Sequence, residues 1–325
     1  MKKKVAFVNF WETFKPKDSL FYKILCKHFD IDLVDLTQAE YVFFSVWGDE
    51  HLYAPNNAVK IYFTGENRTP NFNECDYAMG FERLSFRDRY MRFPLYCIYP
   101  EYLLLEKKQI GIDKGTLNAK KGFCSFTVSN GTCQPRNEMF HLLNSYKRVD
   151  SGGRYLNNIG GRVEDKFAFD KEHKFSIVFE NFSYNGYCSE KIVQAFAAQT
   201  IPIYWGDTLC EETFNTKAFI NVHKYKTFNE VLERVKEIDN NDDLYLEMLS
   251  NPALISEQEG YEGKISQLED FLLNIFSQPH ETARRRTRMS YHEIAKRREM
   301  MEVYYRSKMS IISRLYHWVK GSRLW

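Results

Sequence analysis

The chain has 325 residues, of which 44% are hydrophobic and 27% charged, a balance typical of a globular protein with room for two domains. No window approaches the roughly 18 consecutive apolar residues of a membrane helix, and seven cysteines without metal-type spacing indicate reduced thiols rather than a disulfide framework. The net charge is only +2, and nothing in the chain resembles a nucleic-acid-binding module.

The first 110 residues or so alternate between strand-like and helix-like patterns. Apolar runs and helical spacing predict a strand at 4–10, a helix at 19–29, and strands at 31–36, 41–46, 59–63 and 77–81. Residues 100–121 lose this periodicity and carry several lysines and two glycines, which is typical of a linker.

A second alternating half follows the linker. Its expected elements are a strand at 123–129, a helix at 136–146, a strand at 175–179, a helix at 192–197, a strand at 201–205, and helices at 227–239 and 242–249. Two α/β halves of this kind predict two parallel sheets with helices on their faces.

The segment 174–207 is the most informative part of the chain. It forms a strand–loop–helix–strand unit whose polar residues gather where the first strand leads into the helix. Phosphate-bearing ligands bind at this position in parallel α/β sheets, because helix N–H groups point toward them. Lys191 can therefore hold a phosphate oxygen, and Glu190 can accept bonds from ribose hydroxyls.

This segment carries a family signature, and two further motifs precede it in the chain. The signature consists of Phe179-Glu180-Asn181, Tyr187, Ser189-Glu190-Lys191-Ile192 and residues 201–206; the upstream motifs are Phe63-Thr64-Gly65-Glu66-Asn67 and Val128-Ser129-Asn130 followed by Arg136-Asn137. Together they resemble the bacterial α-1,3/1,4-fucosyltransferases of glycosyltransferase family 10. The chain departs from the usual family pattern, an apolar residue followed by Thr, in having Cys188-Ser189 before Glu190. Ser189 still provides the hydroxyl group.

The resemblance implies a fold of the GT-B type, in which two Rossmann-like α/β domains face each other across a cleft. We expect residues 1–115 to form an acceptor-binding domain, 116–279 to form a GDP-fucose-binding domain, and 280–325 to form a basic amphipathic helical tail.

The resemblance also implies an activity. It predicts inverting transfer of L-fucose from GDP-β-L-fucose to the 3-hydroxyl, or alternatively the 4-hydroxyl, of GlcNAc or Glc in N-acetyllactosamine-type or lactose acceptors. Such a reaction serves the synthesis of Lewis-type surface glycans such as those of lipopolysaccharide. Two alternatives stay open: a GT-B enzyme that uses another GDP-sugar, and a non-catalytic, membrane-associated glycan-binding protein. No cofactor and no bound metal are expected, with divalent cations at most stimulatory.

The site residues follow from the motif matches. Glu66 is the expected general base, with Glu82 as the next candidate and a purely structural role for Glu66 as the alternative. The expected donor-binding residues are Arg136 and Lys191 for the diphosphate, Glu190 for the ribose, and Asn181 and Tyr187 for the phosphates or the fucose ring. Core packing is the competing interpretation for Tyr187.

The tail differs in charge from the rest of the chain. Residues 280–325 carry twelve Lys/Arg and four Glu, a net charge of +8, so the remainder is near −6. Apolar residues recur at helical spacing opposite the basic ones, namely Met301, Tyr304, Ile311, Leu315 and Trp318. This pattern predicts that residues 284–325 contact an anionic membrane surface. The alternative is that the apolar stripe packs on the protein or on another subunit. We expect a cytoplasmic protein, peripheral on the inner membrane if the tail binds lipid.

Overall fold

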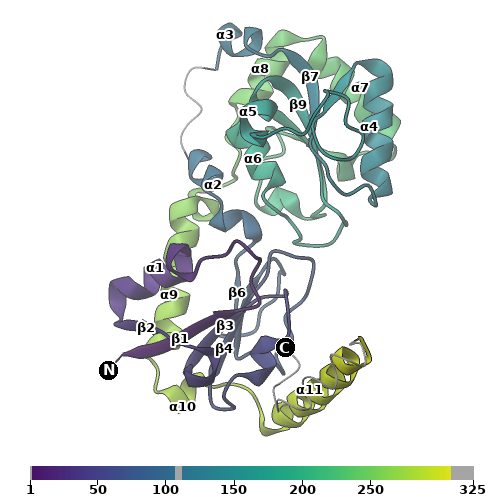
Figure 1. The fold of residues 1–325 in the computed structure, drawn as a ribbon. Coiled ribbons are helices and arrows are strands. Elements are labelled where there is room, and N and C mark those ends of the chain that lie inside the picture. Colours follow the sequence, from purple (N-terminus) through teal and green to yellow (C-terminus); the bar gives the residue numbers. More distant parts are fainter. Residues whose placement is uncertain (1, 107–111, 309–325) are drawn as a thin grey trace.

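The chain forms two parallel β-sheets, each flanked by helices, in a computed structural model that describes residues 2–106 and 112–308 (Figure 1). The six-stranded sheet has the order β2-β1-β3-β4-β5-β6, and the five-stranded sheet has the order β11-β10-β9-β7-β8. The strands are β1 (Lys3–Val8), β2 (Ile31–Leu33), β3 (Tyr41–Phe44), β4 (Val59–Phe63), β5 (Tyr77–Gly80), β6 (Tyr90–Arg92), β7 (Gly122–Phe126), β8 (Val149–Ser151), β9 (His173–Phe179), β10 (Ile201–Trp205) and β11 (Ile220–Asn221).

Helices cover both faces of the sheets, and several of them begin at a side-chain cap. Ser19 accepts from the Tyr22 N–H at the start of α1, and Thr227 accepts from the Glu230 N–H at the start of α7. The helices are α1 (Leu20–His28), α2 (Glu101–Leu104), α3 (Lys114–Asn118), α4 (Gln134–Tyr146), α5 (Lys166–Lys171), α6 (Lys191–Ala197), α7 (Phe228–Asp239), α8 (Asp242–Ser250), α9 (Tyr261–Ser277), α10 (His280–Ala283) and α11 (Arg288–Lys308).

Most of the strands that the sequence predicts have four residues or more; the exception is β2, which was predicted at 31–36 but spans only Ile31–Leu33. All residues of β3 and β4 are buried, as expected for strands of a parallel sheet with both faces covered. The strands β6, β8 and β11 were not predicted, because runs of two or three residues are too short to show a period of two.

Helix α9 belongs by packing to the first domain, which is built on the six-stranded sheet. Phe276 of α9 stacks on Tyr41 of β3 with ring centroids 4.2 Å apart, and α9 lies beside α1 (Figure 1). Leu272 is fully buried in the same core. We expected residues 116–279 to form the second domain, but in the structure the chain returns to the first sheet within that range.

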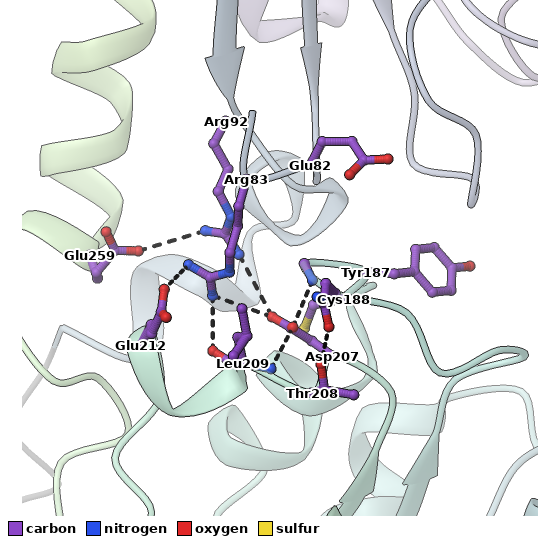
Figure 2. A network of polar contacts seen from close by, with 12 residues as sticks. Glu82, Arg83, Arg92, Tyr187, Cys188, Asp207, Thr208, Leu209, Glu212 and Glu259 are labelled. Atoms are coloured by element: carbon purple, nitrogen blue, oxygen red, sulfur yellow. Dashed lines mark hydrogen bonds and ion pairs between the residues drawn. The ribbon is translucent and has the colours of Figure 1, made fainter. Parts of the chain in front are cut away.

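Ion pairs join the first domain to the second, which is built on the five-stranded sheet (Figure 2). The Asp207 carboxylate follows β10 and is 1% exposed, and its Oδ2 lies 3.4 Å from Nη2 of Arg83 and 4.0 Å from Nη2 of Arg92. Arg83 also pairs with Glu212 at 2.6 Å, and Arg92 lies 3.9 Å from Glu259. Because both arginines come from the first domain, a buried carboxylate of the second domain is neutralised only when the two domains are docked.

Arginines of the C-terminal segment bind the first domain. The fully buried Asp76 carboxylate accepts from the backbone N–H groups of Arg285 and Arg286, each at 2.8 Å, and from Nε of Arg286 at 3.0 Å. Further along, Arg297 of α11 forms an ion pair with Glu74. Basic side chains of this segment are therefore engaged by the protein itself.

Several apolar side chains of α11 face solvent instead, although Ile294 is buried. Four of them have more than half of their surface exposed, namely Met289 (68%), Met300 (64%), Val303 (63%) and Tyr304 (52%). The predicted stripe continues through Ile311, Leu315 and Trp318, which lie outside the described residues. Within residues 2–106 and 112–308, no helix is long and apolar enough to cross a membrane.

We predict that Asp76→Asn destabilises the protein by about 3–5 kcal/mol, because it leaves the guanidinium of Arg286 buried without its counter-charge. Urea unfolding followed by circular dichroism measures this loss. The matched control is Glu237→Gln, which breaks the exposed Arg234–Glu237 pair and should change stability by less than about 1 kcal/mol. Equal stability of Asp76→Asn and the parent would show that this buried pair does not anchor the segment.

Candidate functional site

A buried carboxylate organises the loop between β9 and α6. Glu180 directly follows β9, is fully buried, and accepts hydrogen bonds from the Ser189 N–H at 2.7 Å and the Ser189 hydroxyl at 2.8 Å. The ammonium of Lys191 lies 2.8 Å from its Oε2 and 2.8 Å from the Ser189 hydroxyl. The loop must therefore fold back on itself, which places the start of α6 beside the carboxyl end of β9.

Lys191 presents a cation at this edge of the sheet. Burial lowers the pKa of its ammonium, but the carboxylates of Glu180 and Glu190 outweigh burial, so the pKa is raised above its usual value. The side chain keeps a quarter of its surface exposed. Lys191 is consequently charged at neutral pH, and part of its side chain is accessible to solvent.

The structure brings Arg136 and Asn181 together at the same edge. Arg136 lies in the first turn of α4, is 2% exposed, and donates from Nη1 to the Asn181 side-chain oxygen at 3.0 Å. It also binds the backbone carbonyls of Phe179 and Asn130. Its buried Nε has no hydrogen-bond partner, and burial lowers the pKa of the guanidinium. Arg136 therefore holds two loops in place and retains an unused donor.

The side chain of Tyr187 is buried between the signature loop and the first domain. It is 4% exposed and packs edge-on against Phe81 of the first domain, with ring centroids 5.2 Å apart. Figure 2 shows its side chain directed away from the ion pairs around Asp207. The burial of Tyr187 and its contact with Phe81 agree with a packing role. Tyr187 is also part of the signature loop, so these contacts do not separate packing from ligand binding.

The signature loop also contacts the first domain through its backbone. Gly186 has φ of +85°, and a Cβ there would lie 2.5 Å from the carbonyl oxygen of Phe81, so only glycine fits without strain. The Gly186 N–H donates to Asp207 Oδ1 at 2.7 Å, and the other carboxylate oxygen of Asp207 faces Arg83. The loop that carries Lys191 is therefore held against the first domain.

Glu66 lies across from this loop, in the turn after β4. Its side chain is exposed, whereas its backbone N–H donates to the Thr64 hydroxyl at 2.9 Å and shapes the turn. It lines a cavity of about 500 Å³ together with Trp11, Trp47 and Tyr99. The Glu66 carboxylate can therefore reach a ligand in this cavity. A carboxylate that only accepted hydrogen bonds from its own loop could not.

Tyr99 connects this cavity with the signature loop electrostatically. Burial, helped by the carboxylates of Glu190, Glu101 and Glu66 and opposed by Lys191, raises the pKa of its phenol to about 12. The charges of Glu190, Glu66 and Lys191 also act on the raised pKa of Tyr187. The predicted base and the predicted donor-binding pair thus lie near one another, although they come from different domains.

Sequence reasoning missed Glu180 and Asp207 as organising residues. Both directly follow apolar strands or their closing glycine, and both are almost completely buried. A carboxylate in such a position needs a partner, because an unpaired buried charge is costly. This signal is present in the sequence, but the partners, Ser189 and Arg83, are identified only by the fold.

The alternative base Glu82 is placed differently from Glu66. Its carboxylate accepts from the Thr69 hydroxyl at 2.6 Å and is not among the residues that line the Glu66 cavity. Among the described residues, no group of three or more His, Cys, Asp or Glu side chains could hold a metal ion. The cations at the site are those of Lys191 and Arg136.

Two family models match the chain. Residues 5–99 match the alpha-(1,3)-fucosyltransferase FucT N-terminal domain, and residues 117–251 match the C-terminal part of glycosyltransferase family 10 (fucosyltransferase). The chain is 34% identical over 295 residues to alpha-(1,3)-fucosyltransferase FucT of Helicobacter pylori, which covers 79% of this chain. It spans 62% of that relative's length, which is less than two thirds.

Solved structures agree with these matches. A crystal structure of an alpha1,3-fucosyltransferase with GDP-fucose superposes with a TM-score of 0.68 at 30% identity, covering 83% of this chain and 90% of the other. A second crystal structure of an alpha1,3-fucosyltransferase superposes with a TM-score of 0.71 at 30% identity, over the same shares of the two chains. The expected GT-B arrangement of two α/β domains is confirmed by this likeness.

Proposed function

Because the chain belongs to glycosyltransferase family 10, the fucosyltransferases, we propose that it transfers L-fucose from GDP-β-L-fucose to an oligosaccharide acceptor. The observation that carries this proposal is the partly exposed cation of Lys191, held by buried Glu180, together with a cavity that has Glu66 on its wall. The second domain then binds the donor, and the first domain binds the acceptor.

The donor site uses charges that the fold has already fixed. The ammonium of Lys191 contacts the diphosphate and stabilises the negative charge that develops on it as GDP leaves. Glu190, at the start of α6, accepts hydrogen bonds from the ribose hydroxyls. Arg136 orients Asn181 and adds a second positive charge at this edge of the sheet, which favours the same phosphates.

Glu66 is the general base of the proposed reaction. An acceptor hydroxyl oxygen attacks the anomeric carbon of fucose, the bond from that carbon to the phosphate oxygen breaks, and GDP departs with the electron pair. The acceptor proton passes to the Glu66 carboxylate, which is exposed to the cavity. Attack opposite to the leaving group inverts the anomeric carbon and gives an α-linked product.

The acceptor proposal concerns the chemistry of the first domain's cavity. The aromatic walls around Glu66 suit a pyranose ring, with GlcNAc or Glc of an N-acetyllactosamine-type or lactose unit presenting its 3-hydroxyl to the carboxylate. Products of this kind are Lewis-type glycans of a bacterial surface, such as those on lipopolysaccharide.

We further propose that α11 attaches the enzyme to an anionic membrane surface that presents glycolipid acceptors. The exposed side chains of Met300, Val303 and Tyr304 offer an apolar face, and Arg306 and Lys308 near the end of the helix are exposed as well. Arg286, just before the helix, and Arg297 within it bind the first domain, and the side chains of Met300, Val303 and Tyr304 are left exposed.

Lys191→Ala should weaken GDP binding about tenfold or more, because a charge-assisted contact of this kind is worth roughly 1.5–3 kcal/mol. Isothermal titration calorimetry with GDP measures the change. The matched control is Lys174→Ala, which removes an ion pair with Asp239 at the opposite end of β9 and should leave GDP affinity unchanged. If Lys191→Ala binds GDP as tightly as the parent does, the diphosphate does not lie against Lys191.

Glu66→Gln should lower fucose transfer by about 10²–10⁴-fold while GDP affinity stays unchanged, because the amide cannot accept the acceptor proton. Transfer is measured with GDP-fucose and N-acetyllactosamine. Glu82→Gln is the matched control and should retain transfer, since Glu82 is engaged by Thr69. The reverse result, with Glu82→Gln inactive and Glu66→Gln active, would move the base to Glu82.

A variant truncated after Arg298 should lose binding to anionic vesicles while keeping its fold, because the Asp76 and Glu74 ion pairs remain. Sedimentation with phosphatidylserine-containing vesicles measures binding, with neutral phosphatidylcholine vesicles as the control. Binding of the parent should fall from low to high salt, since surface attraction is screened. Equal sedimentation of the truncated and full chains would refute a membrane role for this segment.

A further inference from the structure

The cavity that contains Glu66 continues into a second cavity of the first domain. The second has a volume of about 380 Å³ and lies over the start of α1. The two share three lining residues, Trp11, Thr13 and Ile98, so they form one groove with Trp11 between its halves. Each half falls within the range of roughly 300–1,000 Å³ that is usual for small-ligand sites.

Trp11 is a fixed part of this groove. Its ring packs edge-on against Phe14 at 5.1 Å, and Phe14 stacks on Phe10 at 4.0 Å. Phe7 continues this chain of rings and stacks on the fully buried Phe43 at 4.8 Å. The loop between β1 and α1 is thus anchored to the core by aromatic contacts, so Trp11 presents a preorganised face.

The chemistry of the groove fits a neutral carbohydrate. Trp11 and Trp47 supply aromatic faces, whose negative potential attracts the C–H bonds on one side of a pyranose ring. The far half adds the exposed side chains of Lys15 and Asp18, which donate to and accept from hydroxyl groups and together carry no net charge. A phosphate-bearing or anionic ligand would find no excess of positive charge there.

We propose that the half of the groove beyond Trp11 is an extended acceptor subsite, which binds the sugar units adjacent to the one that receives fucose. This inference rests on the proposed fucosyl transfer at Glu66, because continuity with that cavity defines the direction in which the acceptor extends. The enzyme then selects neutral oligosaccharides longer than a disaccharide, and Trp11 is a specificity-determining residue.

The test compares kcat/KM for N-acetyllactosamine and for the tetrasaccharide made of two such units, with GDP-fucose saturating. The parent should prefer the tetrasaccharide, and Trp11→Ala should lower this preference by about two- to tenfold, the value of one aromatic contact. Trp11→Phe should restore most of it. GDP affinity should be unchanged in each variant, because Trp11 lies in the acceptor domain.

Two further variants separate the subsite from a folding effect. Lys15→Ala, at an exposed position of the far half, should reduce kcat/KM for the tetrasaccharide and leave the disaccharide unaffected. Leu84→Ala removes an exposed apolar side chain that lines neither half, and should change neither acceptor. Thermal unfolding of all variants checks that they are equally folded.

The outcomes distinguish the two proposals. If both acceptors receive fucose with equal kcat/KM in the parent, or if Trp11→Ala and Lys15→Ala keep the parent's preference, the extended subsite is overturned and the proposed function stands. If neither acceptor receives fucose, the proposed function fails and the subsite fails with it.

Discussion

The site depends on one constraint, that the buried carboxylate of Glu180 must be neutralised where β9 ends. Water cannot solvate it, so the protein supplies the Ser189 N–H, the Ser189 hydroxyl and the Lys191 ammonium. These partners lie nine to eleven residues away and can reach Glu180 only if the intervening loop turns back. The position of α6 and the charge of Lys191 both follow from this requirement.

A second buried carboxylate relates the two domains in the same manner. Asp207 binds the Gly186 N–H within its own domain and faces Arg83 of the other, so the signature loop and the first domain are held by one side chain. This explains how Glu66 and Lys191, 125 positions apart in the sequence, act on the same phenol of Tyr99. The fold therefore assembles the site at the joint, and neither domain contains it alone.

The sequence predicted the parts of the structure that local patterns encode. Apolar runs located β4 and β9, and the motif match identified Lys191 and Glu66, which the structure places on opposite sides of one joint. It did not predict that α9 packs on the first sheet, because amphipathic spacing defines a buried face but not the surface that covers it. The pairing of tail arginines with Asp76 was missed for a similar reason, since long-range contacts leave no local period.

The return of the chain to the first sheet has a consequence for recombining this protein with its relatives. Helix α9 and the Arg286 anchor complete the core of the first domain, although they follow the second domain in sequence. A chimera with a single crossover between the domains would pair the first sheet of one parent with the covering helix of another. The second domain is thus inserted into the first, and an exchange of this domain needs two junctions, one before β7 and one before α9.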